Sequence, residues 1–359
     1  MKYTVSVAMC TYNGEQYLQE QLDSLANQTI TPNELVICDD CSTDNTIQIL
    51  EKFKSQVPFT VKIIQNENRI GVVQNFSNAI VNCTQDIIFL SDQDDYWQPT
   101  RIEKMLQQFE IDPRRMVVSS NAIFGDDKLN PIPMESMLES RLAIDKYFGK
   151  MANGYLTTKN IPLEAGCSMA LQRAYAHQIF PLTLKEIGYD VWISNITPFL
   201  GIKYFICEEP LFIHRLHNNN CSWSLVNKQY ETQRNIEQVQ KENKKFYVRS
   251  LQVYWRSEPI YKFALNFSVD LPKDCIDSQE AQNRKEELLK YMNYLDFRRN
   301  MQRHFGRSLY GLFSRECKAI YRQCPQPVLC QFYDLWKSFD NIPKNPLHWF
   351  KRKKAEQNQ

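Results

Sequence analysis

The chain has 359 residues, enough for one large and one smaller domain, and its hydrophobic share of 43% is ordinary for a protein with a packed core. The formal net charge of +2 excludes a chain-wide nucleic-acid-binding surface, so no nucleic-acid partner is expected. The 11 cysteines are odd in number and scattered, which argues against a disulfide framework and favours reduced thiols in a cytosolic protein.

The first 90 residues alternate short apolar runs with segments of helical spacing. We predict strands over residues 4–10, 34–38, 61–65 and 86–90, and helices over residues 15–28, 42–54 and 71–81. This βαβαβαβ order predicts an α/β fold with a mostly parallel sheet flanked by helices.

The middle of the chain is less regular, with a proline-containing loop over 126–134, a strand and helix over 166–179 and a strand over 205–215. No run reaches the roughly 18 apolar residues of a membrane-spanning helix, and the N-terminus lacks a signal-peptide pattern. From about residue 225 the sequence becomes polar, helical and rich in basic and aromatic residues. We therefore divide the chain into an α/β domain over 1–225 and a helical domain over 226–359.

Polar clusters follow all four predicted strands of the first half, at Thr11–Gly14, Asp39–Asp40, Asn66–Gly71 and Ser91–Asp95. In open α/β sheets, ligands bind beyond the carboxyl ends of the strands. We therefore expect a binding site at this edge of the sheet.

The fourth cluster places three carboxylates within four positions. Asp92 and Asp94 point the same way from an extended chain, and a hard divalent cation is the usual partner of such a group. A cation held there can bridge to an anionic diphosphate. An acidic surface turn is the alternative interpretation.

The second cluster, Asp39 to Asp44, is also acidic. A carboxylate at this place can accept hydrogen bonds from a pyrimidine base or from ribose hydroxyls. The alternative is that Ser42 or Asp44 only caps the following helix.

Four segments, VSVAMCTYNGEQYLQEQLDSLANQ, ELVICDDCSTDNT, NENRIGVVQNFSNAI and DIIFLSDQDDYW, occur in an order that resembles family 2 glycosyltransferases of the GT-A fold. The sequence is especially similar to bacterial rhamnosyl- and galactosyltransferases of capsule and O-antigen synthesis. The resemblance covers roughly residues 3 to 223. It implies a nucleotide-sugar donor and a divalent cofactor, Mg²⁺ or Mn²⁺.

The resemblance assigns roles to individual residues of the first half. It implies that the base and ribose pocket and the nucleotide's surroundings are formed by Thr11, Tyr12, Asn13, Asp39, Asp40 and Arg69. It further implies that Asp92 contacts the ribose, that Asp94 holds the metal and the diphosphate, and that Asp95 supports either role. Trp97 belongs to the same motif and is expected to support the acceptor side.

Two later segments complete the family pattern. The strand containing Gly166 resembles the one before the acceptor side, and Tyr189–Trp192 resembles a motif whose aspartate is the general base. This implies that Asp190 deprotonates the acceptor hydroxyl, with Trp192 in support, and that one displacement inverts the anomeric configuration. Many relatives have His where this chain has Tyr189, and Tyr supplies no cation there. Helix capping by Asp190 is the alternative.

The segment from Arg215 to Asn220 resembles the family's Arg-x-His-x-x-Asn pattern. The guanidinium of Arg215 suits a diphosphate, and the imidazole of His217 suits the metal. A polar loop with an internally satisfied histidine is the alternative.

Residues 284–359 hold 16 Lys and Arg against 7 Asp and Glu, a local balance of +9. Cations mixed with aromatic residues suit an anionic membrane surface, and a lipid-linked acceptor would make such contact useful. An ordinary helical domain with solvated charges, or a homodimer interface, is the alternative.

These patterns predict a metal-dependent, inverting glycosyltransferase that acts in the cytoplasm, peripherally on the inner face of the cell membrane. The favoured donor is dTDP-rhamnose, then a UDP-sugar such as UDP-galactose, and the acceptor is a hydroxyl of a lipid-linked surface glycan. A catalytically silent binding module on the same fold, and a nucleotidyl transferase or nucleotide-sugar hydrolase, are the competing hypotheses.

Overall fold

A computed structural model describes residues 2–133, 136–137, 165–182, 188–217, 265, 267–303, 314–315 and 317–318. The chain divides into two compact units: the first holds residues 1–146, 158–236 and 259–285, and the second holds residues 147–157, 237–258 and 286–359. The predicted domain boundary near residue 225 lies outside the described residues.

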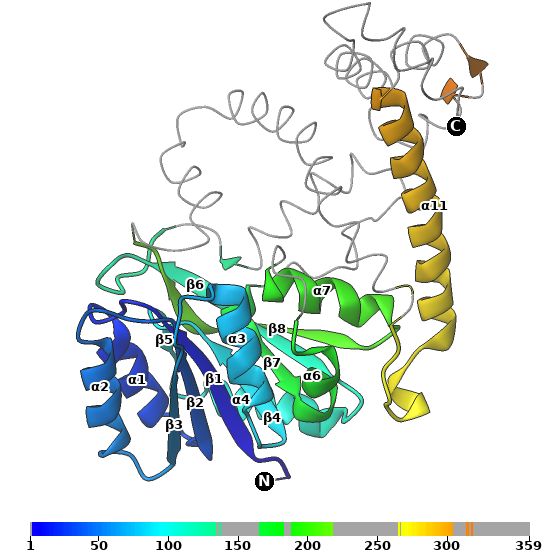
Figure 1. The fold of residues 1–359 in the computed structure, drawn as a ribbon. Helices are drawn as coiled ribbons and strands as arrows, with labels where there is room; N and C mark the ends of the chain where they lie inside the picture. The colour runs from blue at the N-terminus through cyan, green and yellow to red at the C-terminus, as the bar shows by residue number, and fades with distance from the viewer. Residues whose placement is uncertain are drawn as a thin grey trace, which may run out of the picture. The chain divides into compact units, whose positions relative to one another are not determined.

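The first unit is built on an eight-stranded mixed sheet (Figure 1). Its strands are β1 (Val5–Thr11), β2 (Glu34–Asp39), β3 (Thr60–Gln65), β4 (Ile87–Ser91), β5 (Tyr96–Trp97), β6 (Val117–Gly125), β7 (Met169–Gln172) and β8 (Tyr204–Arg215). The order across the sheet is β3-β2-β1-β4-β7-β6-β8-β5. Strands β3, β2, β1 and β4 are parallel, β7 is antiparallel to both of its neighbours, and β6 is parallel to β8.

Helices cover both faces of this sheet (Figure 1). They are α1 (Leu18–Ala26), α2 (Thr46–Lys54), α3 (Val72–Val81), α4 (Arg101–Ile111), α6 (Arg173–Ile179) and α7 (Tyr189–Phe199). On one face α3 packs on β1 and β2, α6 packs on β4 and β7, and α7 lies against α3. On the other face α1 packs on β5 and α2, and α4 packs on β6 and β8.

The apolar pattern explains these layers. All seven residues of β1 are buried, as expected for a central strand covered on both faces. In α1 the side chains of Leu18, Leu22 and Leu25 are fully buried, because this spacing puts them on one side of the helix. The predicted α/β fold is confirmed, and the predicted strands and helices of the first 90 residues are observed within a few residues of their predicted ends.

Strand β6 was missed by the sequence analysis, which treated its region as irregular. The polar residues Ser119, Ser120 and Asn121 interrupt its apolar pattern, although all three are buried between neighbouring strands. The loop predicted after it is confirmed over its described part: residues 126–129 form a turn, and Pro131 bridges back to Gly125.

Part of the C-terminal region belongs to the first unit. Asp270 exchanges two hydrogen bonds with Gln178 of α6, and Ile276 forms an isolated β-bridge with Ile202 after α7. Helix α11 (Ser278–Arg303) agrees with the predicted helical character of this region. Most of the basic and aromatic tail beyond it lies outside the described residues. Among the helices of the described residues, none has the length and apolarity to span a bilayer.

Candidate active site

The loops after β1 and β2 form one interlocked unit at the carboxyl edge of the sheet. The Asp39 carboxylate accepts hydrogen bonds from the Thr11 hydroxyl at 2.8 Å, and from the hydroxyl and backbone N–H of Ser42 at 2.5 and 2.8 Å. Asn13 donates from its backbone to Ser42 and accepts from the backbone of Thr43. Asp39 is buried, at 1% exposure, and the hydrogen bonds of its carboxylate link the two loops.

Asp40 is bound mainly by the start of α3. Its carboxylate accepts hydrogen bonds from the backbone N–H groups of Ile70 and Gly71 at 2.7 and 2.8 Å, which are otherwise unpaired donors at a helix N-terminus. The guanidinium of Arg69 lies 4.0 Å from this carboxylate and 3.9 Å above the ring centroid of Tyr12. Arg69 is 64% exposed, so this stacked pair is accessible from solvent.

Gln93, between the two predicted aspartates, fastens the acidic loop to the β1 loop. Its side-chain amide accepts from the Tyr12 N–H at 2.9 Å and donates to the Tyr12 carbonyl at 3.1 Å. A Cβ on Gly14 would lie 2.3 Å from the Gln93 Oε1 atom, so a larger residue at position 14 would push this amide away from the Tyr12 backbone. Gln93 was not predicted as a site residue, and its place between two aspartates is its only signal in the sequence.

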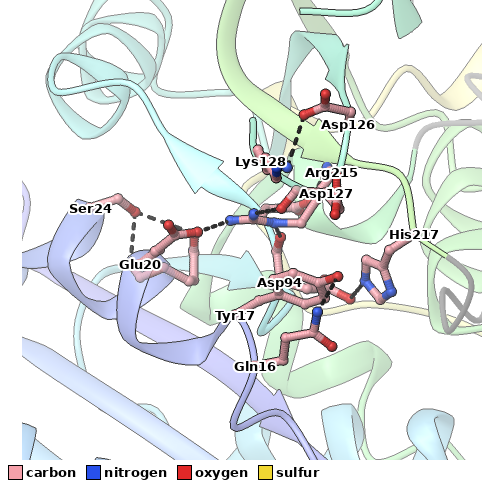
Figure 2. A network of polar contacts seen from close by, with 12 residues as sticks. Gln16, Tyr17, Glu20, Ser24, Asp94, Asp126, Asp127, Lys128, Arg215 and His217 are labelled. Carbon is pink, nitrogen blue, oxygen red and sulfur yellow. Dashed lines mark hydrogen bonds and ion pairs between the residues drawn. The ribbon is translucent and has the colours of Figure 1, made fainter. Parts of the chain in front are cut away.

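The structure brings the two predicted metal ligands together from distant parts of the chain. His217 Nε2 lies 2.9 Å from Asp94 Oδ2, and the His217 ring packs on Tyr17 with centroids 4.6 Å apart (Figure 2). Both side chains are mostly buried, at 9% and 14% exposure. A carboxylate and an imidazole from distant parts of the chain thus meet in one direct contact.

Arg215 lies directly beside this pair (Figure 2). Its Nε donates to the Asp94 carbonyl at 2.8 Å, Nη1 donates to the Asp127 carbonyl at 2.5 Å, and Nη2 pairs with the Glu20 carboxylate at 2.5 Å. Its guanidinium also covers the ring of Tyr17 at 4.5 Å. The Arg215 side chain is only 1% exposed, so its positive charge interacts with protein groups and not with solvent.

A buried group of charges lies beneath the acidic loop. His214 Nδ1 contacts Asp95 Oδ1 at 2.8 Å, and both residues are buried. Burial lowers the pKa of His214, but the Asp95 carboxylate outweighs it and raises that pKa to about 9. Burial and the neighbouring carboxylates of Asp95 and Asp94 raise the pKa of Asp92 well above its ordinary value.

Arg101 completes this buried group and was not singled out by the sequence. Its fully buried guanidinium lies between the rings of Trp97 and Phe212, 4.3 Å from each centroid, and donates to the Cys167 carbonyl at 2.5 Å. Burial lowers the pKa of Arg101 to about 10, so it stays charged at neutral pH. Asp92 and Asp95 are therefore faced by two buried cations, Arg101 and His214.

The predicted base, Asp190, lies in the first turn of α7, whose N-cap is Gly188. Its Oδ1 accepts a hydrogen bond from the N–H of Val191 at 2.7 Å. The preceding residue, Tyr189, is buried and stacks on Phe76 of α3 with centroids 4.0 Å apart. Burial raises the pKa of the Tyr189 hydroxyl well above its ordinary value, and the charges of Asp92 and Asp190 raise it further.

The lack of a side chain on Gly166 makes room for the Tyr189 ring. A Cβ on Gly166 would lie 2.1 Å from Cε2 and 2.2 Å from the hydroxyl oxygen of the Tyr189 ring. The two predicted supporting tryptophans lie in the core: Trp97 is fully buried, and Trp192 is 1% exposed and donates from Nε1 to the Ile179 carbonyl at 3.0 Å. Their supporting role in the site stays a prediction.

Residues 6–180 match the family model described as Glycosyl transferase family 2. The chain is 28% identical over 224 residues to an uncharacterized glycosyltransferase of Nostoc sp., covering 60% of this chain and 66% of the relative. It is 27% identical over 220 residues to the dTDP-rhamnosyl transferase RfbG of Shigella flexneri, covering 59% and 72%.

Among solved structures, S. aureus TarS 1–349 in complex with UDP is similar in fold, with a TM-score of 0.54 and 16% sequence identity over 94% of this chain and 88% of that one. The match to the Nostoc protein spans just under two thirds of that relative. The mixed sheet, the flanking helices and these matches agree on the GT-A fold. Residues 6–180 of the chain therefore belong to glycosyl transferase family 2.

Proposed function

We propose that this protein transfers a sugar from a nucleoside diphosphate donor to an acceptor hydroxyl with inversion of configuration. The observation that carries the proposal is the pairing of Asp94 and His217, 2.9 Å apart and 123 positions apart in sequence, at the edge of the sheet where ligands of such folds bind. Membership of glycosyl transferase family 2 supports the reaction class.

The Asp94 and His217 pair fits a divalent cation. The Asp94 carboxylate and the His217 imidazole, in contact at 2.9 Å, are both ligand types that divalent cations accept, and these two side chains would hold the ion. Carboxylate oxygen suits both Mg²⁺ and Mn²⁺, whereas imidazole nitrogen is a softer ligand that favours Mn²⁺. When bound, the cation offsets negative charge on the leaving diphosphate.

The donor's nucleoside is expected at the interlocked loops. The exposed Arg69–Tyr12 stack offers a surface for a base, and Asp39 and Asp40 carry negative charge beside it. We favour dTDP-rhamnose, which the name of the Shigella relative supports, and then a UDP-sugar such as UDP-galactose, which the UDP complex of TarS supports.

Asp190 is the proposed base. It would take the proton of the acceptor hydroxyl, whose oxygen attacks the anomeric carbon on the side opposite the leaving nucleotide, so one displacement inverts the configuration. Tyr189 holds the start of α7 through its stack on Phe76 and its packing on Gly166. Because Tyr189 stays neutral, it positions Asp190 without adding charge.

The proposed acceptor is a hydroxyl of a lipid-linked glycan in bacterial surface polysaccharide synthesis. The basic balance of residues 284–359 supports contact with an anionic membrane surface on the cytoplasmic side. A homodimer would use the same region.

Nucleotide release tests the function. The full chain would be incubated with dTDP-rhamnose, UDP-galactose and other nucleotide sugars, with Mn²⁺ or Mg²⁺, and with or without a lipid-linked acceptor extract. We expect one donor to be consumed only with metal and acceptor, and Asp94→Ala and Asp190→Ala to lose activity. Glu51→Ala, on the exposed side of α2, is the control and should retain it.

Other outcomes would contradict the proposal in distinct ways. Equal turnover without acceptor would identify a hydrolase. No turnover of any donor, together with no metal-dependent nucleotide binding by calorimetry, would identify a protein on the same fold without the proposed chemistry.

A further inference from the structure

Glu20 and Arg215 form an ion pair between α1 and the end of β8, 195 positions apart in sequence. Arg215 is 1% exposed, whereas Glu20 is 56% exposed and approaches from the solvent side. An ion pair with one partner this exposed contributes little to stability, so its position beside the metal pair calls for another explanation.

Arg215 contacts the supports of both metal ligands (Figure 2). Its Nε holds the main-chain carbonyl of Asp94 at 2.8 Å, which fixes the residue that carries the carboxylate. The Tyr17 ring lies 4.5 Å from the Arg215 guanidinium and 4.6 Å from the His217 ring, so one aromatic ring packs against both side chains.

The charge of Arg215 opposes the binding of a cation beside it. An uncompensated guanidinium next to Asp94 and His217 would repel a divalent ion, and the repulsion is strong where water is excluded. The Glu20 carboxylate, bonded to Nη2, neutralises this charge while leaving the hydrogen bond to Asp94 in place.

We propose that Glu20 and Arg215 are positioning residues of the cation site: Arg215 fixes the Asp94 main chain, and Glu20 offsets the Arg215 charge and so sets the affinity of Asp94 and His217 for their cation. The inference rests on the proposed function. It assigns Arg215 to the support of the metal pair, in place of the diphosphate contact that the family resemblance implied.

Substitution of Glu20 tests this inference, because the exposed side chain can be changed without disturbing the core. Mn²⁺ binding would be measured by calorimetry in the presence of dTDP, and in parallel of UDP, for wild type, Glu20→Gln and Glu20→Lys. We expect Glu20→Gln to weaken Mn²⁺ binding about 10-fold, as for other partners of metal ligands, and Glu20→Lys to weaken it further. Asp23→Asn removes the same charge from the same helix, where the carboxylate accepts from Gln19, and should bind as wild type.

Turnover as a function of Mn²⁺ concentration gives a second readout. For Glu20→Gln the Mn²⁺ concentration at half-maximal rate should rise by the same factor, while the rate at saturating Mn²⁺ recovers. Arg215→Lys loses the planar guanidinium whose Nε donates to the Asp94 carbonyl, so its maximal rate should stay low at any Mn²⁺ concentration. Melting curves should show the Glu20 variants folded as wild type.

The outcomes separate this inference from the proposed function. If wild type binds Mn²⁺ and turns over a donor, but Glu20→Gln shows an unchanged Mn²⁺ midpoint, the inference is wrong and the function stands. The inference is also wrong if the maximal rate of Glu20→Gln falls while its Mn²⁺ midpoint stays that of wild type, because that result indicates a merely structural role of Glu20. If wild type neither binds Mn²⁺ nor consumes a donor, both the proposed function and this inference are wrong.

Discussion

A methyl group added at Gly166 should displace the residue that precedes the proposed base. In Gly166→Ala the new Cβ would lie 2.1 Å from Cε2 of Tyr189, whereas ordinary contacts begin near 3.4 Å, so the ring must move by about 1 Å. Phe76, stacked at 4.0 Å, hinders retreat of the ring. Overpacking of this kind costs about 1–3 kcal/mol of unfolding free energy. Because Asp190 follows Tyr189 directly, we also expect kcat to fall about 100-fold, with little change in the donor's KM.

Denaturant unfolding and steady-state rates would measure both effects, and Tyr189→Leu supplies the matched test. Leucine has no atoms at the positions of Cε2, Cζ and the hydroxyl, so the double variant should be about as stable as Tyr189→Leu alone. The reasoning is refuted if Gly166→Ala is as stable as wild type to within about 0.5 kcal/mol, or if the two costs simply add.

Three further predictions follow from other contacts. Gln93→Leu removes both hydrogen bonds to the Tyr12 backbone and should raise the donor's KM about 10-fold. Gln93→Glu keeps the acceptor for the Tyr12 N–H and should raise the KM less, and unchanged KM values in both variants would contradict this prediction. The pKa of His214 is raised beside Asp95, so this pair stabilises the fold fully below about pH 6.5 and loses its contribution as pH rises through about 9. The free energy of unfolding of wild type should therefore fall between these two pH values, and that of His214→Gln should change less. Gly201→Ala should cost about 1–3 kcal/mol, because φ is +70° and the Cβ would lie 2.2 Å from a backbone carbonyl oxygen; a melting temperature equal to wild type would exclude this strain.

The sequence predicted the part of the fold whose signals are local. The apolar runs that become β1 to β4 and the helical spacing of α1 to α3 each lie within about ten residues, so period and composition were enough. Strand β6 was missed for the converse reason: its buried Ser119 and Ser120 look polar in sequence, and only the neighbours β7 and β8 make it a strand.

The candidate site was predicted less completely, because many of its contacts span the chain. Asp94 and His217 were assigned together through the family resemblance, and the structure brings them within 2.9 Å. No local pattern pairs Arg215 with Glu20, however, and none marks Arg101 as a cation enclosed by two aromatic rings. Partners this distant become visible only once the sheet order is known.

The interlocking of the loops after β1 and β2 bears on how donor preference can be changed. Asp39 is held by Thr11, and Asn13 exchanges hydrogen bonds with Ser42 and Thr43, so each loop carries the other's partners. A chimera that imports residues 39–46 from a relative would separate these pairs unless residues 11–15 come with them. Recombination libraries should therefore treat residues 11–46 as a single cassette, with crossover points placed before β1 and inside α2.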